Sequence, residues 1–215
     1  MKILVIGANG RTGLQTASTL KNSGYEVIAG VHSPNHMDYV KKLNLEVRKI
    51  DLIDMTVTQI AVEMHDIDLV VFASGAAQNH PELAMWIDLD GAVKTMQAAQ
   101  KVGIERFIML SAAGAEDRST WDIYDIPNYY LAKYYAEDFL KKSGLIYTII
   151  RPGILTNDLP KDKVSLVDSS GDPRVSRSDV ASVVLQAIEN PHLENTSFNL
   201  YSGQTDIDKI IPSQD

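Results

Sequence analysis

The fold of this chain is decided by the stretch Gly7-Ala8-Asn9-Gly10-Arg11-Thr12-Gly13. It follows the apolar run Lys2–Ile6, which predicts a buried strand, and it opens a helical pattern. In such a loop the first glycine allows a tight turn, the second lets a ligand approach the backbone, and the third lets helix and strand pack closely. The free amides at the helix N-terminus attract phosphate groups. With a second strand expected at Glu26–Val31, the stretch predicts a βαβ unit that binds the pyrophosphate of a dinucleotide.

Short apolar runs alternate with helix-length segments as far as about Glu189, a pattern typical of a parallel sheet covered on both faces. The expected strands are Lys2–Ile6, Glu26–Val31, Glu46–Ile50, Leu69–Ala73, Arg106–Leu110 and Tyr147–Arg151, with a late strand at Ser197–Leu200. A last long helix is expected over Ser178–Glu189. The sequence therefore predicts an α/β fold, a Rossmann-type doubly wound parallel sheet with helices on both faces, as a single domain over residues 1–215.

Local signals mark where the helices begin and end. Gly24, Gly103 and Gly144 each follow a helical pattern and precede a strand, where a left-handed residue is expected. Thr56 and Gln59 have the spacing of a capping box that opens a helix. We expect the intervening segments to be regular helices.

Composition excludes several classes of function. The 215 residues are 45% hydrophobic and 22% charged, and none is cysteine, which excludes disulfides, thiolate catalysis and iron–sulfur clusters and predicts a reducing cytoplasmic location. The net charge of −8 and the lack of a basic cluster argue against nucleic acid as a partner. No apolar run approaches the roughly 18 residues of a membrane span. The five histidines lack metal-ligand spacing, so no metal site is expected.

Two long irregular stretches, 114–127 and 154–177, follow predicted strands. Loops at the carboxyl ends of strands form the ligand crevice of an open α/β sheet, so both are candidate walls of a substrate pocket. Trp121 and Tyr124 in the first stretch either cover a planar ligand or anchor the loop to the body of the protein.

The end of the second strand indicates which dinucleotide binds. A carboxylate there would hold the ribose 2′-hydroxyl of NAD, but none occurs before Asp38. Arg11 on the glycine loop, together with His32 and Ser33, is expected to bind a 2′-phosphate instead. NADP is therefore the predicted cofactor, with NAD the less favoured choice.

A Tyr-x-x-x-Lys pair at Tyr129 and Lys133 indicates acid–base chemistry. On a helix this spacing puts both side chains on one face, and a cation beside a phenol lowers the pKa of the phenol from about 10 toward neutrality. Such a phenol is a usable general acid for a carbonyl oxygen. Ser111 ends the fifth strand, where its hydroxyl is expected to point into the crevice. The alternative is a solvated Tyr–Lys pair without a catalytic role.

These features resemble the atypical short-chain dehydrogenase/reductases, in particular the short NAD(P)-binding group related to biliverdin-IXβ-reductase-like and NmrA-like proteins. The resemblance rests on the glycine loop, Ser111, Tyr129-x-x-x-Lys133, the Ser143–Gly153 segment and Val175–Ala181, and it covers nearly the whole chain. It implies a Rossmann domain that binds NADP.

The resemblance also implies roles for individual residues. Tyr129 would protonate the substrate oxygen, Ser111 would orient the substrate, and Lys133 would hold the nicotinamide ribose. The family's usual asparagine falls on Asp88, which cannot donate a hydrogen bond when ionised. The implied cofactor-binding residues are Gly7, Asn9, Gly10, Arg11, Thr12, Gly13, His32, Ser33, Asp51 (at the adenine), Ala73, Ser74, Gly75, Lys133, Pro152 and Gly153.

The leading interpretation is an NADP-dependent oxidoreductase that transfers hydride to a small carbonyl-type substrate, as a monomer or a small homo-oligomer with no nucleic-acid or membrane partner. One alternative is a non-catalytic NADP-binding redox sensor, favoured by Asp88 and by the short carboxy-terminal part. The other is an NAD(P)-dependent epimerase or dehydratase.

Overall fold

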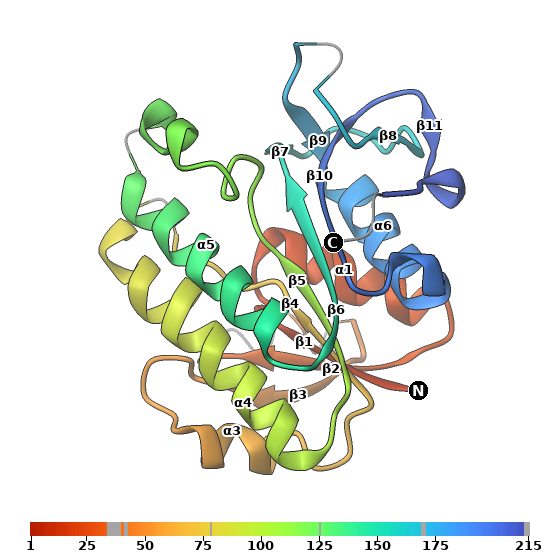
Figure 1. The fold of residues 1–215 in the computed structure, drawn as a ribbon. Helices are drawn as coiled ribbons and strands as arrows, with labels where there is room; N and C mark the ends of the chain where they lie inside the picture. The colour runs from red at the N-terminus through yellow and green to blue at the C-terminus, as the bar shows by residue number, and fades with distance from the viewer. Residues whose placement is uncertain (34–39, 41–42, 78, 125, 169–170, 213–215) are drawn as a thin grey trace.

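A twisted sheet forms the centre of the molecule (Figure 1). The computed structural model describes residues 1–33, 40, 43–77, 79–124, 126–168 and 171–212. In that part of the chain the main sheet has nine strands in the order β11-β8-β10-β6-β5-β4-β1-β2-β3. All pairs from β10 to β3 are parallel, whereas β8 is antiparallel to both β10 and β11. The predicted Rossmann-type parallel sheet is confirmed.

Among the described residues, seven strands follow the predicted runs closely, and four further short strands occur beside them. They are β1 (Lys2–Ile6), β2 (Glu26–Val31), β3 (Glu46–Lys49), β4 (Leu69–Phe72), β5 (Arg106–Leu110), β6 (Ile146–Pro152), β7 (Ile154–Thr156), β8 (Lys163–Ser165), β9 (Arg174–Ser176), β10 (Thr196–Ser202) and β11 (Thr205–Asp206). In register, Ile3 of β1 lies between Val27 of β2 and Leu69 of β4. Strand β1 is therefore enclosed by neighbours on both edges, as its unbroken apolar sequence requires.

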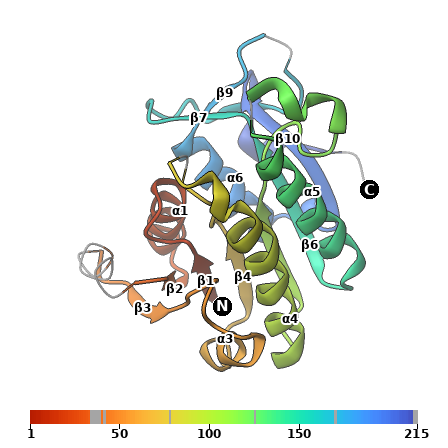
Figure 2. The same ribbon diagram turned by 90° about the vertical axis from the view of Figure 1, so that its left-hand side faces the viewer.

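Helices cover both faces of this sheet (Figure 2). The longer ones are α1 (Arg11–Asn22), α3 (Val57–Glu63), α4 (Ala92–Val102), α5 (Pro127–Lys142) and α6 (Arg177–Glu189). A π-helix, η3 (Met85–Gly91), runs directly into α4, and short 3₁₀ turns lie at η2 (Pro81–Leu83), η4 (Arg118–Tyr124), η5 (Pro191–Leu193) and η6 (Ile207–Lys209). Figure 2 shows α1 and α6 on one side of the sheet and α3, α4 and α5 on the other.

Each face has its own hydrophobic core. Under α1 and α6, Leu20 and Val184 pack on sheet residues such as Val5. Under α3, α4 and α5 a second core includes Met96 and Phe72. Burying a side chain of this size contributes about 1.5–3 kcal/mol, so the two cores hold the sheet rigidly between the helix layers.

The predicted start and stop signals are present. Gly24, Gly103 and Gly144 have φ values of 90°, 79° and 80°, in the left-handed region. Thr56 Oγ1 accepts a hydrogen bond from the Gln59 amide, and the Gln59 side chain accepts one from the Thr56 amide at 2.8 Å. The capping box is confirmed.

The stretch 154–177 differs from the prediction. We expected it to be irregular, but it contains β7, β8 and β9. Strands β7 and β9 form a separate two-stranded sheet, and β8 joins the edge of the main one. Each has only three residues, which is too short for a periodic pattern to reveal.

Candidate functional site

The glycine loop connects β1 to α1 in the tight conformation that its sequence predicts. Gly7 has φ of +82°, and a Cβ atom there would lie 2.8 Å from the backbone of Ser74. A Cβ atom on Gly13 would lie 2.2 Å from the carbonyl oxygen of Gly7. A larger residue at position 7 would therefore push the loop away from the end of β4. A larger residue at position 13 would push the start of α1 away from the loop.

The start of α1 presents free backbone donors. The first helical hydrogen bond runs from the Leu14 amide to the Gly10 carbonyl at 2.8 Å. The amides of the first turn, which belong to Arg11, Thr12 and Gly13, therefore have no helical acceptor. Donors of this kind at a helix N-terminus suit a phosphate group.

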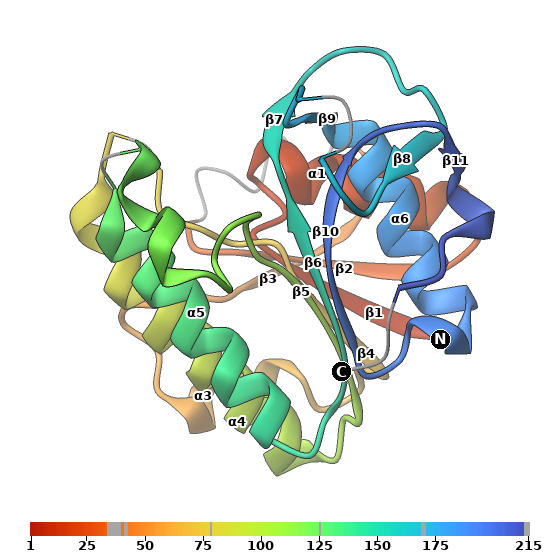
Figure 3. The same cartoon turned by 45° about the horizontal axis from the view of Figure 1, so that its top comes forward.

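A cavity of about 960 Å³ lies beside this loop, at the carboxyl ends of the central strands. Figure 3 shows the segments that follow β5 and β6 on either side of these strand ends. Both long stretches contribute to the wall, the first through Gly114 and Thr120 and the second through Leu155 and Pro173. The remaining lining residues include Arg11, Ala76, Ser111, Tyr129, Tyr130, Pro152, Gly153 and Arg177.

Lys133 is buried on α5 and contacts three polar partners. Its ammonium group is 2.8 Å from Asp88 Oδ1 and donates to the carbonyl oxygens of Leu110 at 3.2 Å and Ser74 at 3.5 Å. Asp88 is fully buried, and its other oxygen accepts a hydrogen bond from the Ala76 amide at 2.8 Å. Burial lowers the pKa of Lys133, but the combined effects of Asp88, Tyr129 and Glu137 outweigh it, and the net shift is upward. Asp88 and Lys133 therefore form a buried ion pair.

Tyr129 lies one helical turn before Lys133, whose ammonium is 5.6 Å from the centre of the tyrosine ring. The expected lowering of the Tyr129 pKa is wrong. Burial raises this pKa above its ordinary value of 10.0; Lys133 lowers it, but the nearby charge of Asp88 raises it again. The sequence expectation counted the cation alone, whereas the fold pairs that cation with a carboxylate from η3. Tyr129 is therefore a protonated hydrogen-bond donor at neutral pH.

Ser111 borders the cavity but donates its hydroxyl proton away from it. The hydroxyl forms a very short hydrogen bond to Glu137 Oε1. Glu137 in turn accepts from Arg151 Nε at 3.0 Å and from Arg151 Nη2 at 2.6 Å. All three side chains are buried. Because the only proton of Ser111 is used by Glu137, its oxygen faces a ligand as an acceptor.

The other predicted cofactor residues have different surroundings. Asp51 accepts hydrogen bonds from the amides of Ile53 and Asp54 and so closes the turn after β3. A Cβ atom on Gly75 would lie 3.0 Å from Asp88, and the Ala73 amide donates to the Ile6 carbonyl. Asn9 is partly buried on the glycine loop.

The expected binding of a 2′-phosphate by Arg11 with His32 and Ser33 stays a prediction. Among the described residues Arg11 lines the cavity together with Arg177, whereas His32 and Ser33 follow β2 and do not line it. Asp38, the first carboxylate after β2, lies outside the described residues.

Trp121 anchors the 114–127 stretch. It is 8% exposed, its indole donates to the Ala115 carbonyl at 3.2 Å, and its ring packs on Tyr134. Of the two roles left open by the sequence, this favours anchoring. The side chain of Tyr124 lies outside the described residues.

Three residues that sequence reasoning missed now stand out. Glu137 is four residues beyond Lys133 on the same face of α5, so extending the Tyr-x-x-x-Lys spacing by one turn would have found it. Arg151 is a charged residue at the end of an apolar strand. Arg177 begins α6 within the Val175–Ala181 segment.

The residues present fit a dinucleotide. The glycine loop is a cradle that added Cβ atoms would fill, and Arg177 Nε is buried with no hydrogen-bond partner in the described part of the chain. No group of three or more His, Asp or Glu residues among those described could hold a metal ion. No helix of the described chain is long and apolar enough to span a bilayer.

Comparison with known proteins agrees with this fit. A family model described as NAD(P)H-binding matches residues 7–191. The chain belongs to this NAD(P)H-binding family. It is similar to the uncharacterized sugar epimerase YhfK of Bacillus subtilis, with 35% identity over 98% of this chain and 99% of that relative.

Solved structures show the same fold. A protein of Bacillus halodurans, provisionally named an NAD-dependent epimerase/dehydratase, has a TM-score of 0.89 at 34% identity over 97% of both chains. A short-chain dehydrogenase/reductase of Veillonella parvula, solved in complex with NADP, has a TM-score of 0.72 at 21% identity over 97% of this chain and 98% of that chain. The NAD(P)H-binding family and the Rossmann-type fold that the resemblance implies are both confirmed.

Proposed function

We propose that this NAD(P)H-binding protein is an NADP-dependent oxidoreductase that reduces a small carbonyl-type substrate, with Tyr129 as the proton donor. The observation that carries the proposal is the meeting of Tyr129, Ser111 and the glycine loop around one cavity. The lack of cysteine fits action in a reducing compartment such as the cytoplasm.

Reduction of a carbonyl adds a hydride to carbon and a proton to oxygen. The cofactor supplies the hydride chemistry when bound. The Tyr129 hydroxyl donates the proton, because its raised pKa keeps it protonated until negative charge develops on the substrate oxygen. Tyrosine then regains a proton from water in the cavity.

Ser111 and Lys133 position the reacting groups. Because the Ser111 hydroxyl already donates to Glu137, its oxygen acts as an acceptor toward a ligand. It therefore selects an N–H or O–H donor beside the carbonyl, on the substrate or on a carboxamide group. Of the contacts of Lys133, the one to the Ser74 carbonyl is the longest at 3.5 Å and is the one that a ribose hydroxyl would replace. Asp88 keeps Lys133 charged in this buried place.

A Tyr129→Phe variant tests this function. We expect the rate of NADPH oxidation with an identified aldehyde, ketone, quinone or flavin to fall about 10²- to 10⁴-fold, the usual contribution of a general acid. NADPH affinity, measured by fluorescence titration, should change little. Tyr135→Phe is the matched control, because Tyr135 lies on the exposed side of the same helix. Full activity in Tyr129→Phe would remove this tyrosine from the mechanism.

A non-catalytic redox sensor is the second candidate, favoured by the raised pKa of Tyr129 and by the pairing of Lys133 with Asp88. Tight NADP binding without NADPH oxidation across that panel of substrates supports it. The names of two relatives favour a third candidate, an epimerase or dehydratase. Turnover of a sugar nucleotide without net consumption of cofactor supports that one.

A further inference from the structure

Arg177 is the first residue of α6 and borders the cavity from the side of β9. Its Nη1 donates to the Asn157 side chain at 2.8 Å, which fixes the direction of the guanidinium. Its Nε is buried and has no hydrogen-bond partner among the described residues. A buried N–H without an acceptor destabilises a protein unless a ligand supplies the acceptor.

Arg11 occupies the corresponding place on α1, which packs beside α6 on the same face of the sheet (Figure 2). Both arginines line the same cavity. Burial lowers the pKa of Arg177, and the positive charge of Arg11 lowers it further, so the two cations repel each other. Asp168 also lines this cavity, yet within the described part of the chain neither arginine forms an ion pair. Two positive charges therefore face a cavity to whose described lining Asp168 contributes the one carboxylate.

We propose that Arg11 and Arg177 together form a binding site for the pyrophosphate of the dinucleotide. The site deepens the proposed function and rests only on its cofactor-binding part. Arg11 directly follows Gly10 and shares the first turn of α1 with the free amides, which are the donors that a pyrophosphate needs. Arg177, at the start of α6, lies in the wall of the same cavity and contacts the same anion from there.

This assignment changes the role of Arg11. The ribose 2′-phosphate of NADP is recognised after the second strand of a Rossmann fold, where His32 and Ser33 lie. Arg11 lines the cavity together with Pro152, Gly153 and Arg177, whereas His32 and Ser33 are not among its lining residues. Arg11 and Arg177 therefore serve NADP and NAD alike, and any preference for NADP depends on residues after β2.

The test compares cofactor affinities of full-length variants by calorimetric titration. Arg177→Gln should weaken NADP⁺ and NAD⁺ by the same factor, about tenfold to hundredfold, because a charge-assisted hydrogen bond is lost from each complex. Arg177→Lys should weaken the binding of both cofactors less, since it keeps the positive charge. Arg174→Gln is the matched control: it removes the same charge three residues away, where Arg174 is exposed and pairs with Asp172, and it should leave both affinities unchanged.

The cofactor-free protein gives a second readout. Because Arg177→Gln removes repulsion from Arg11, its melting temperature should equal or exceed that of the unmodified protein. A structural role for Arg177 predicts the reverse, a lower melting temperature with cofactor affinity reduced only through misfolding. A variant that fails to fold therefore counts against the proposal.

The remaining outcomes separate the possible anions. Loss of NADP⁺ affinity alone would mean that the arginines bind the 2′-phosphate, and unchanged affinity for both cofactors would mean that they bind a substrate anion; either result overturns the proposal. Inorganic pyrophosphate tests the site without the rest of the cofactor. If the protein bound neither dinucleotide but bound pyrophosphate through Arg177, the oxidoreductase proposal would fail and this anion site would stand.

Discussion

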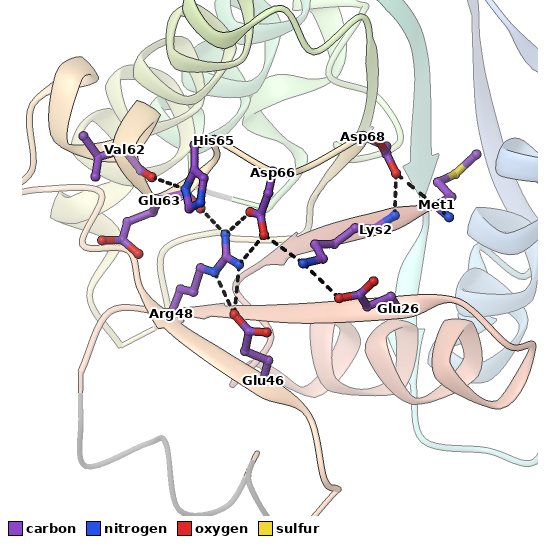
Figure 4. A network of polar contacts seen from close by, with 10 residues as sticks. All are labelled: Met1, Lys2, Glu26, Glu46, Arg48, Val62, Glu63, His65, Asp66 and Asp68. Atoms are coloured by element: carbon purple, nitrogen blue, oxygen red, sulfur yellow. Dashed lines mark hydrogen bonds and ion pairs between the residues drawn. The ribbon is translucent and has the colours of Figure 1, made fainter.

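The two ends of the parallel strands differ in how far their ion pairs are exposed to water. At the amino ends of β1 to β4, Lys2 lies 2.8 Å from Asp66 and 2.9 Å from Glu26, and Arg48 bridges Asp66 and Glu46 (Figure 4). These carboxylates are one-third to three-fifths exposed. At the carboxyl ends, the pairs Lys133–Asp88 and Arg151–Glu137 are almost completely buried.

The difference follows from the cost of removing charge from water. Exposed pairs keep most of their hydration, so they form and break at small cost and contribute little to stability. Buried pairs have lost that hydration, and each remains favourable only while its partner is present. The two ion pairs of the described chain in which both partners are buried thus lie at the end of the sheet that holds the cavity, where Glu137 orients Ser111 and Lys133 lies beside Tyr129.

Glu137→Met should give the largest loss of stability, because it removes the buried carboxylate that accepts hydrogen bonds from Arg151 Nε and Nη2, while Glu116 is a more distant partner at 3.6 Å. Arginine does not deprotonate in proteins, so the cost cannot be relieved. We expect the free energy of unfolding in urea to fall by about 3–5 kcal/mol. Asp138→Asn, which breaks the exposed neighbouring pair with Lys142, is the control and should lower it by about 0.5 kcal/mol or less. Equal effects of the two substitutions would contradict the contrast between buried and exposed pairs.

Asp88→Asn should cost less, about 3 kcal/mol at neutral pH, because the orphaned Lys133 can release its proton. In the unmodified protein the raised pKa of Lys133 stabilises the fold below pH 10.5, and this contribution is lost as the pH rises through the folded-state pKa. In Asp88→Asn the effect of burial on Lys133 dominates, and the folded-state pKa of Lys133 falls below 10.5. Its free energy of unfolding should therefore rise between neutral pH and 10.5, where that of the unmodified protein does not.

Urea unfolding of both proteins at several pH values measures these slopes. Asp90→Asn, which removes an exposed carboxylate from the same π-helix, should keep the slope of the unmodified protein. If Asp88→Asn also kept the pH slope of the unmodified protein, Lys133 would not depend on Asp88 for its charge.

Asp66→Asn at the opposite end of the strands should have the smallest effect. Hydrogen bonds from Arg48 and Lys2 hold the pKa of Asp66 well below its usual range. Its stabilising effect is therefore present above about pH 3.8 and is lost as the pH falls through the folded-state pKa. We expect a slight fall in the urea midpoint at neutral pH that disappears in 1 M NaCl, since salt screens exposed charges. A loss that matches Asp88→Asn, or that survives high salt, would mean that the partly exposed carboxylates of this network do not behave as surface charges.

Local sequence determined the elements that carry strong periodic or capping signals. Strand β5 begins and ends at the predicted residues, and the capping box at Thr56 and the left-handed glycines occur where expected. These features depend on interactions within a few residues, or on burial so complete that the whole strand must be apolar. The cradle formed by Gly7, Gly10 and Gly13 is predictable for the same reason, because a backbone conformation that excludes Cβ atoms requires glycine.

The chemistry of the cavity was decided by tertiary structure. Asp88 lies 45 residues before Lys133 in the sequence, and only the packing of η3 on α5 brings the two together and reverses the expected pKa shift of Tyr129. Glu137 accepts the hydrogen bond of the Ser111 hydroxyl through a contact between α5 and the end of β5. In the same way α1 and α6 bring Arg11 and Arg177 to one cavity. The sequence therefore indicated where a dinucleotide would bind, because the backbone conformation of the glycine loop depends on residues that are neighbours in the chain. The charges and hydrogen-bond directions around it depend on long-range packing, because burial and distance set their energies.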